Sequence, residues 1–132
     1  MACNSNSLLL KNVDVAICVP VRPEVLVGST RLKAGTAQKM VLNMLSTAAM
    51  IQLGKVYQNR MVYMQASNKK FLRRAEEMVA ELGEVSPETA AELFQKSGNH
   101  IKTAIVMAKL KINSQEAGKR LKAVDDNLSK IL

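Results

Sequence analysis

The chain has 132 residues, of which 48% are hydrophobic and only 3% aromatic, and its formal net charge is +8. This length suits one modest domain or two very small ones, and the hydrophobic content is enough for a packed core, which excludes global disorder. Eight methionines and no tryptophan predict an aliphatic, helical core in which methionine fills gaps, although methionine can also line a ligand surface.

The positive charge alone would admit nucleic-acid or membrane-surface binding. The cations are, however, spread along the chain, and the densest group, in residues 69–74, stands at helical spacing from the glutamates of residues 76–81. With so few aromatic side chains, a base-stacking surface is not expected. We therefore expect a solvated basic helix face and no nucleic-acid partner.

Cysteine usage and the amino-terminal sequence indicate the compartment. Cys3 and Cys18 are too far apart for a C-x-x-C motif and have no metal-type cluster beside them, so both are expected to be free thiols. Residues 1–6 are polar and the apolar run at 8–10 is too short for a secretory signal. Because no apolar run reaches membrane-spanning length, we expect a cytoplasmic protein that binds neither a membrane nor a metal.

In chain order, the first predicted element is a strand. Residues 13–19 are rich in β-branched side chains and apolar on both faces, which is typical of a buried strand in a parallel sheet. Pro20 and Pro23 end it. No second convincing strand follows, so this strand either pairs with another copy or belongs to a larger protein.

Glu24 lies between that strand and the glycine at position 28. It would stand at the carboxyl edge of the strand, where ligands bind in open α/β sheets. The alternative is an exposed loop glutamate. We keep Glu24 as a candidate ligand contact.

The segment from Gly28 to Lys39 joins the strand to a predicted helix. It holds two glycines, two threonines, one serine and three cations, and backbone N–H groups, hydroxyls and positive charge at such a turn bind anions. The candidate contacts are the side chains of Ser29, Thr30, Arg31, Lys33, Thr36 and Lys39. Arg31 is best suited to bidentate contact with a phosphate. The alternative is a helix-entry turn capped by Thr30 or Thr36.

A helical pattern then runs from about Ala34 to Leu53. It is apolar nearly all round, so the helix is expected to be buried or to lie at an interface. We expect the chain to form a homo-oligomer through this helix. Gly54 is predicted to end it.

The sequence after this helix is ambiguous over residues 56–65, which suit a strand, a turn or a helix. A helix follows, with Ser67 or Asn68 as its cap and Gly83 as its end.

Three short helices are predicted in the remaining residues. Pro87 follows a serine that is a good amino-terminal cap, and Asn113 with Glu116 resembles a capping box. The three helices are expected at residues 86–96, 100–110 and 113–131. Short helices with single apolar stripes must pack on each other, so residues 84–132 are expected to form a compact three-helix unit.

Other catalytic motifs are absent from the sequence. The single histidine, His100, lies near a predicted cap without a serine or cysteine partner, and we expect it to be structural or exposed. Asp125 and Asp126 are expected to be solvated acids. There is no phosphate-binding P-loop, no G-x-G-x-x-G and no H-E-x-x-H motif.

Two blocks, Pro23–Leu26 and Gly28–Thr47, closely resemble N-acetylmuramic acid 6-phosphate etherases. These enzymes are sugar-isomerase-type (SIS) proteins related to the glucokinase regulatory protein. The likeness also covers residues 3–7, 54–57, 61–62, 68–70 and 104–107, and therefore spans essentially the whole chain.

The resemblance implies that this chain corresponds to the carboxyl-terminal part of a longer enzyme. Residues 1–55 would be the last strand and helix of an α/β SIS domain, and residues 56–83 a connecting segment and helix. Residues 84–132 would form a three-helix domain similar to ubiquitin-associated folds. The chain itself would then be mainly α.

Members of this family cleave the D-lactyl ether of N-acetylmuramic acid 6-phosphate, giving N-acetylglucosamine 6-phosphate and D-lactate, by elimination and water addition without a metal or other cofactor. The resemblance places the reaction in peptidoglycan recycling. It also places the acid/base glutamates upstream of the matched region, so it assigns no catalytic residue here and implies that the isolated chain is inactive. The alternative is a non-catalytic phosphosugar-sensing or protein-interaction module.

The resemblance supports the turn at residues 28–31 as part of a phosphosugar pocket. Arg31 and Ser29 are the best-placed contacts, and the wider set of candidates is Ser29, Thr30, Arg31, Glu24 and Lys33. Two residues depart from the family pattern, because Arg22 stands where the family usually has glycine and Val27 where it usually has threonine. Arg22 adds bulk and charge beside the expected pocket.

Overall fold

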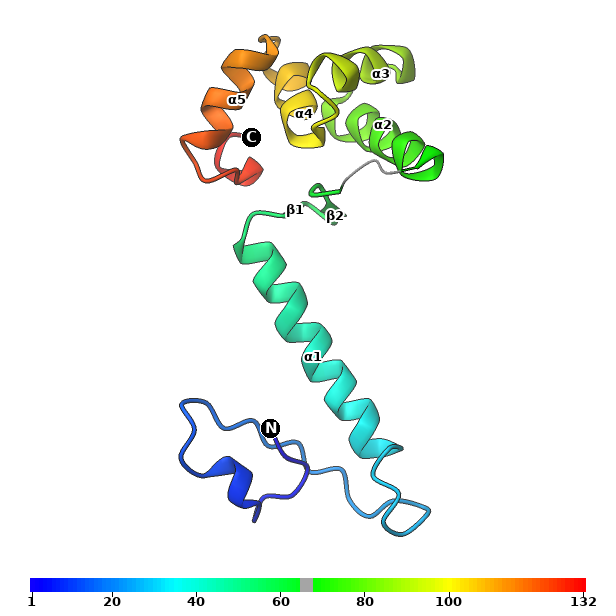
Figure 1. Ribbon diagram of the computed structural model, residues 1–132, viewed down its shortest axis with the longest axis vertical. Helices are drawn as coiled ribbons and strands as arrows, with labels where there is room; N and C mark the ends of the chain where they lie inside the picture. Colours follow the sequence, from blue (N-terminus) through cyan, green and yellow to red (C-terminus); the bar gives the residue numbers. More distant parts are fainter. Residues whose placement is uncertain (65–67) are drawn as a thin grey trace. The chain divides into compact units, whose positions relative to one another are not determined.

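The computed structural model describes residues 1–64 and 68–132, which form two compact units, 1–48 and 49–132 (Figure 1). Within the described ranges the chain has five α-helices, two 3-10 helices and one two-stranded sheet, which confirms the mainly α class. The α-helices are α1 (Lys33–Gln52), α2 (Lys69–Gly83), α3 (Pro87–Lys96), α4 (Ile101–Leu110) and α5 (Ser114–Lys122). The other elements are η1 (Leu8–Leu10), β1 (Val56–Tyr57), β2 (Arg60–Met61) and η2 (Leu128–Lys130).

The predicted strand at residues 13–19 is wrong for this chain. The segment is joined to the amino terminus by one parallel bridge, in which the Ala2 N–H donates to the Ile17 carbonyl at 2.9 Å and the Ala2 carbonyl accepts from the Val19 N–H at 3.0 Å. A strand that is apolar on both faces needs neighbours along its length, and the described residues supply this single contact. Within the described residues the segment therefore belongs to no sheet, and it bends at residues 14–15.

Helix α1 occupies nearly the range predicted for it. Gly54 ends it as expected, with a φ of +64°, and the Gly54 N–H donates to the Ile51 carbonyl at 2.9 Å. No α1 residue is buried, although the whole helix is described. Its large exposed side chains are Met40, Leu42, Met44, Leu45, Met50 and Ile51. The expectation that this helix is buried within the chain is thus wrong. The alternative, that it lies at an interface, stays a prediction.

The ambiguous residues after α1 begin with a short hairpin. Strand β1 pairs antiparallel with β2, with Val56 opposite Met61 and Tyr57 opposite Arg60. Val62 follows directly and is only 2% exposed, because it packs into the core of the helical unit. Gln65, the last residue of the ambiguous range, lies outside the described residues.

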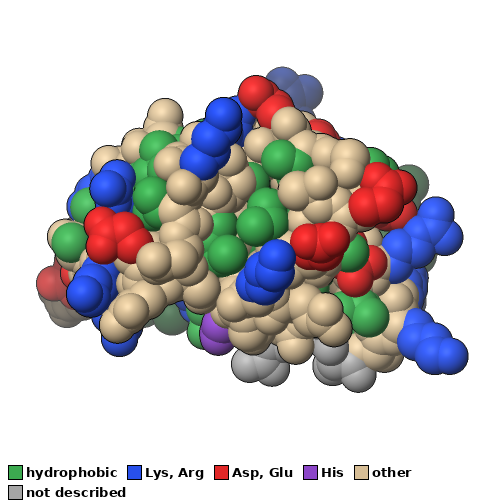
Figure 2. All heavy atoms as spheres, turned by 90° about the horizontal axis from the view of Figure 1, so that it is seen from above, with side chains coloured by type: hydrophobic (Ala, Val, Ile, Leu, Met, Phe, Trp, Pro, Cys, Tyr) green, Lys and Arg blue, Asp and Glu red, His purple; other side chains and the backbone are tan. Residues whose placement is uncertain are grey.

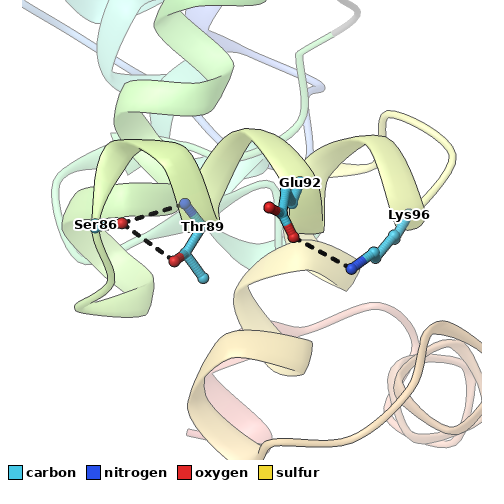
Figure 3. A network of polar contacts seen from close by, with 4 residues as sticks. All are labelled: Ser86, Thr89, Glu92 and Lys96. Atoms are coloured by element: carbon cyan, nitrogen blue, oxygen red, sulfur yellow. Dashed lines mark hydrogen bonds and ion pairs between the residues drawn. The ribbon is translucent and has the colours of Figure 1, made fainter.

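Local capping signals place the starts of three helices correctly. Asn68 caps α2 by accepting the Phe71 N–H at 3.0 Å, and the other candidate cap, Ser67, lies outside the described residues. Ser86 caps α3 by accepting the Thr89 N–H at 3.2 Å, as Figure 3 shows. Each cap satisfies an N–H group that has no partner within the helix.

The capping box predicted at the start of α5 is half formed. The Asn113 side chain accepts the Glu116 N–H at 2.9 Å. The Glu116 carboxylate, however, accepts from the Arg120 guanidinium at 3.1 Å. The cap is therefore supplied by Asn113 alone, and Glu116 forms an i,i+4 pair along the helix.

The last helix is shorter than predicted. It ends at Lys122, whereas the pattern suggested that it continues towards Ile131. Asp125 and Asp126 both have a φ of +55°, a left-handed conformation that aspartate tolerates better than most residues and that interrupts a helix. The chain turns back there, and Leu128 in η2 is 1% exposed in the core.

Helix α4 is at the centre of the unit formed by residues 49–132. It packs against α2, α3 and α5, and its residues Ala104, Ile105 and Val106 are fully buried. Helix α2 contributes four core side chains, so it packs with the three helices that follow it. The fully buried large side chains are Phe94, Ile105, Leu128, Val79 and Val106.

Helices α2 and α4 approach closely at Gly83. Helix α2 ends at this residue as predicted, although the left-handed residue that follows the helix is Glu84, with a φ of +55°. A Cβ atom at Gly83 would lie 2.8 Å from the Cβ of Ala108 on α4. Glycine is thus required here by the packing of two helices.

No helix in the described residues is both long and apolar enough to cross a membrane.

We expect Gly83→Ala to destabilise the helical unit by about 1–3 kcal/mol, because the added methyl overpacks the contact with Ala108. The matched control is Gly118→Ala in α5, where a Cβ would meet no atom within 4 Å. That variant should instead be stabilised by roughly 0.4–1 kcal/mol. Urea unfolding followed by circular dichroism measures both changes, and equal behaviour of the two variants would contradict the close contact.

Candidate functional site

The turn before α1 is shaped by Gly28. Its φ of +80° lies in the left-handed region that glycine adopts without a Cβ penalty. The Ser29 N–H donates to the Leu26 carbonyl at 3.0 Å, and the Thr30 N–H donates to the Gly28 carbonyl at 3.1 Å. These bonds form a tight turn that leads into α1.

Glu24 caps α1 from outside the helix. Its Oε2 accepts the Lys33 N–H at 3.0 Å and its Oε1 accepts the Ala34 N–H at 3.0 Å. The expected alternatives, capping by Thr30 or Thr36, are replaced by this carboxylate, and the Thr36 hydroxyl instead donates to the Leu32 carbonyl at 2.9 Å. A carboxylate is favourable at this position because the amino-terminal end of a helix is partially positive.

Lys33 closes the same loop from the other side. Its ammonium donates to the Pro23 carbonyl at 2.5 Å. The hydrogen bonds from the Ala34 and Lys33 N–H groups hold the pKa of Glu24 below its usual 4.5, and the Lys33 charge adds to this effect. Glu24 and Lys33 are therefore joined by backbone and charge interactions across the turn.

Two of the remaining candidates, Thr30 and Arg31, border hollows beside the first turns of α1. Thr30 lies next to Met1–Cys3 and Gln38 in one of them. Arg31 and Lys33 line the other, which continues over Thr36 to Met40.

Of the five candidates, Thr30, Arg31 and Lys33 therefore line these hollows, and Glu24 reaches the first amides of α1. Ser29 is half-buried and lines neither of the two hollows. In the part of the chain that the structure describes, Arg31 makes no ion pair.

Met1–Cys3 lie beside Thr30, a neighbour that the sequence does not predict. The parallel bridge between Ala2 and Cys18 holds the amino terminus there. A single bridge leaves no pattern in the sequence that would reveal this neighbour.

A further hollow lies between the hairpin exit and the first turn of α4. It is lined in part by Tyr63, His100 and Lys102. The Lys102 ammonium donates to the Asp126 carbonyl at 2.6 Å and lies 5.8 Å from the centre of the Tyr63 ring. Lys55 lies over the same ring at 4.2 Å. Burial lowers the pKa of Lys102, with a further contribution from the Lys55 charge and opposition from Asp126.

Helix α2 takes part in two ion pairs, one within the helix and one with β2. Arg73 pairs with Glu77 at 2.8 Å, and Arg60 from β2 pairs with Glu81 at 2.6 Å. Exposed pairs of this kind contribute little to stability. Figure 2 shows acidic and basic side chains interspersed over one face of the molecule.

Other side chains that can ligate a metal or act as nucleophiles include the cysteines, the histidine and the acids. Within the described ranges, no cluster of three His, Cys, Asp or Glu side chains is arranged to hold a metal ion. Cys3 and Cys18 are free thiols, and the exposed His100 occupies the cap position of α4 without a capping side-chain hydrogen bond.

Comparison with known proteins gives a consistent result. No protein-family model matches the chain. It is 48% identical over all 132 residues to an N-acetylmuramic acid 6-phosphate etherase of Oenococcus oeni, of which it covers 44%. Over 121 residues, 92% of this chain, it is 52% identical to 41% of the etherase of an Exiguobacterium species and 50% identical to 41% of that of Mycolicibacterium smegmatis.

The chain matches the carboxyl-terminal part of N-acetylmuramic acid 6-phosphate etherases. It spans less than half the length of these relatives. The resemblance found in the etherase-like blocks of the sequence is thereby confirmed.

Arg22 is the departure from the etherase pattern that the structure explains best. Its φ is +60°, in the left-handed region that non-glycine residues adopt at a cost. A glycine, which the etherase resemblance leads one to expect there, fits this backbone without strain. Arg22 therefore keeps the backbone shape of a glycine position at an energetic disadvantage.

We expect closure of the turn by Glu24 to depend on pH. The pKa of Glu24 is lowered below 4.5 in the folded chain. The stabilisation of the turn by its carboxylate is therefore fully present above pH 4.5 and is lost as the pH falls through the folded pKa. An NMR titration should show the amide signals of Lys33 and Ala34 following this carboxylate. In Glu24→Gln the acid-dependent shift should disappear, and its persistence would contradict the contact.

Proposed function

We propose that this chain is the part of an N-acetylmuramic acid 6-phosphate etherase that supplies one wall of the phosphosugar pocket and a surface for self-association. The observation that supports this proposal most is the 48% identity to an etherase over the whole chain. The reaction of the complete enzyme is cleavage of the D-lactyl ether of N-acetylmuramic acid 6-phosphate to N-acetylglucosamine 6-phosphate and D-lactate. This is a carbon–oxygen lyase step in cytoplasmic amino-sugar catabolism, and peptidoglycan recycling supplies its substrate.

The turn at residues 28–31 is the proposed wall. Arg31 is exposed at the entrance of α1, and a guanidinium offers two parallel donors to a phosphate. The hydroxyls of Ser29 and Thr30 supply further donors. Glu24 and Lys33 border the same turn.

The proposed domain organisation follows the same relationship. Residues 1–55 correspond to the last strand and helix of an SIS domain, residues 56–83 to a connection, and residues 84–132 to a domain similar to ubiquitin-associated folds. In the longer protein, neighbouring strands would be available to residues 13–19, whose one strand-like contact among the described residues is the Ala2 bridge. The exposed apolar side chains of α1 would likewise be covered.

We expect the 132-residue chain alone to release no D-lactate from the substrate, because the acid/base glutamates of the family lie upstream of the matched part. A chimera that joins the amino-terminal part of the Oenococcus oeni etherase to this chain should be active. In the chimera, Arg31→Met should lower kcat/KM by about 10- to 150-fold, the range expected for losing a hydrogen-bonded charge worth roughly 1.5–3 kcal/mol.

Two controls sharpen this measurement. Lys122→Met removes a cation from the exposed part of α5 and should leave kcat/KM unchanged. Arg22→Gly replaces the arginine at a left-handed backbone position. The kcat/KM of this variant of the chimera tests whether Arg22 impairs the pocket. Activity of the isolated chain, or an Arg31→Met chimera as active as its parent, would count against the proposed wall.

We expect the chain to self-associate through α1. Leu45 is 54% exposed and lies among other uncovered apolar side chains, so association would remove them from water. Light scattering should report an oligomer for the chain and a monomer for Leu45→Glu. Gln52→Glu introduces the same charge at a polar position of the helix and should remain oligomeric. A parent chain that stays monomeric at high concentration would contradict this assignment.

The second candidate is a non-catalytic phosphosugar-sensing or protein-interaction module. It is favoured by the helical unit of residues 49–132, which has its own core. The chimera with the Oenococcus oeni etherase distinguishes the two candidate functions. If this chain is an etherase part, the chimera turns over substrate; if it is a sensing module, the chimera does not.

A further inference from the structure

Glu24 differs from the other helix caps of this chain. Helices α2, α3 and α5 are capped by neutral side chains directly before the helix, at Asn68, Ser86 and Asn113. Helix α1 is capped by a charged side chain nine residues before Lys33 and ten before Ala34. A cap at this separation closes a loop, and the loop it closes contains Ser29, Thr30 and Arg31.

We propose that Glu24 is a positioning residue, which fixes the loop of residues 24–34 and reserves the leading amides of α1 for itself. The inference rests on the proposed function where it concerns the ligand. The contacts left for a phosphate are then the Arg31 guanidinium and the hydroxyls of the turn.

The hydrogen bonds of the loop support this division of roles. Both carboxylate oxygens of Glu24 are engaged, each with one amide at 3.0 Å. A phosphate at the same amides would have to displace the carboxylate or lie beside it, where like charges repel.

Lys33 is engaged in the same closure. Its ammonium donates to the Pro23 carbonyl, next to Glu24 in the chain, so both ends of the loop are fastened by this pair of residues. Within the described residues, Arg31 has no such carboxylate partner. The loop therefore divides into residues that hold it closed and residues that remain available to a ligand.

The first arm of the test uses the 132-residue chain without ligand at pH 7. Amide hydrogen exchange, measured by NMR, should become at least about tenfold faster at Lys33 and Ala34 in Glu24→Gln, a change equivalent to ~1.4 kcal/mol. The matched control is Glu88→Gln, which alters a glutamate in the first turn of α3 whose pKa is also lowered. Unchanged exchange in Glu24→Gln, or an equal effect of Glu88→Gln, would overturn the positioning role.

The second arm adds inorganic phosphate at constant ionic strength. In the parent chain the signals of Thr30 and Arg31 should shift while the amides of Lys33 and Ala34 stay in place. In Glu24→Gln those two amides should shift as well, because they have become available. Movement of both amides in the parent chain would show displacement of Glu24 and overturn the proposal.

The two arms separate this inference from the proposed function. If phosphate shifts no signal of the turn in either protein, the phosphosugar wall is contradicted. The exchange measurement still decides the role of Glu24, because it involves no ligand.

Discussion

Burial of α4 is the constraint on which the helical unit depends. Five of its ten residues are buried, and three other helices pack around it. Helices of about ten residues are marginal when isolated in water, so their stability comes from this shared core. Val62 after the hairpin and Leu128 in η2 belong to the same buried core.

The unit of residues 1–48 lacks such a centre. Val15, Val25 and Val27 are each at least 75% exposed, and the large side chains of α1 are uncovered. Its order depends on short polar contacts, chiefly the Glu24 cap and the Ala2 bridge. The chain that shows this contrast spans less than half the length of the relatives that it matches.

The sequence predicted best those features that depend on neighbouring residues. The sequence predicts the caps Asn68, Ser86 and Asn113 because a capping side chain and its amide lie two or three residues apart. The strand at 13–19 failed because a parallel strand requires partners that local preference does not report. The early end of α5 is not predicted either, since Asp125 and Asp126 follow a pattern that still favours a helix.

The candidate turn shows the same division. Its glycine, hydroxyls and cations were evident from composition, and the structure brings Thr30, Arg31 and Lys33 to the entrance of α1. The structural role of Glu24 was not evident, because its partners lie nine and ten residues away and the contact exists only once the loop has closed. Chemistry and resemblance both predict Ser29 as a contact, but neither predicts that its side chain is half-buried.

The contact between Gly83 and Ala108 has an evolutionary consequence. At the crossing of α2 and α4 there is room for a Cβ atom at only one of these two positions, because a Cβ at Gly83 would lie 2.8 Å from the Cβ of Ala108. Among related sequences, a residue larger than glycine at the first position should therefore accompany glycine at the second, or a wider crossing of the two helices. Covariation at this pair would measure how rigidly the family keeps the distance between those helices.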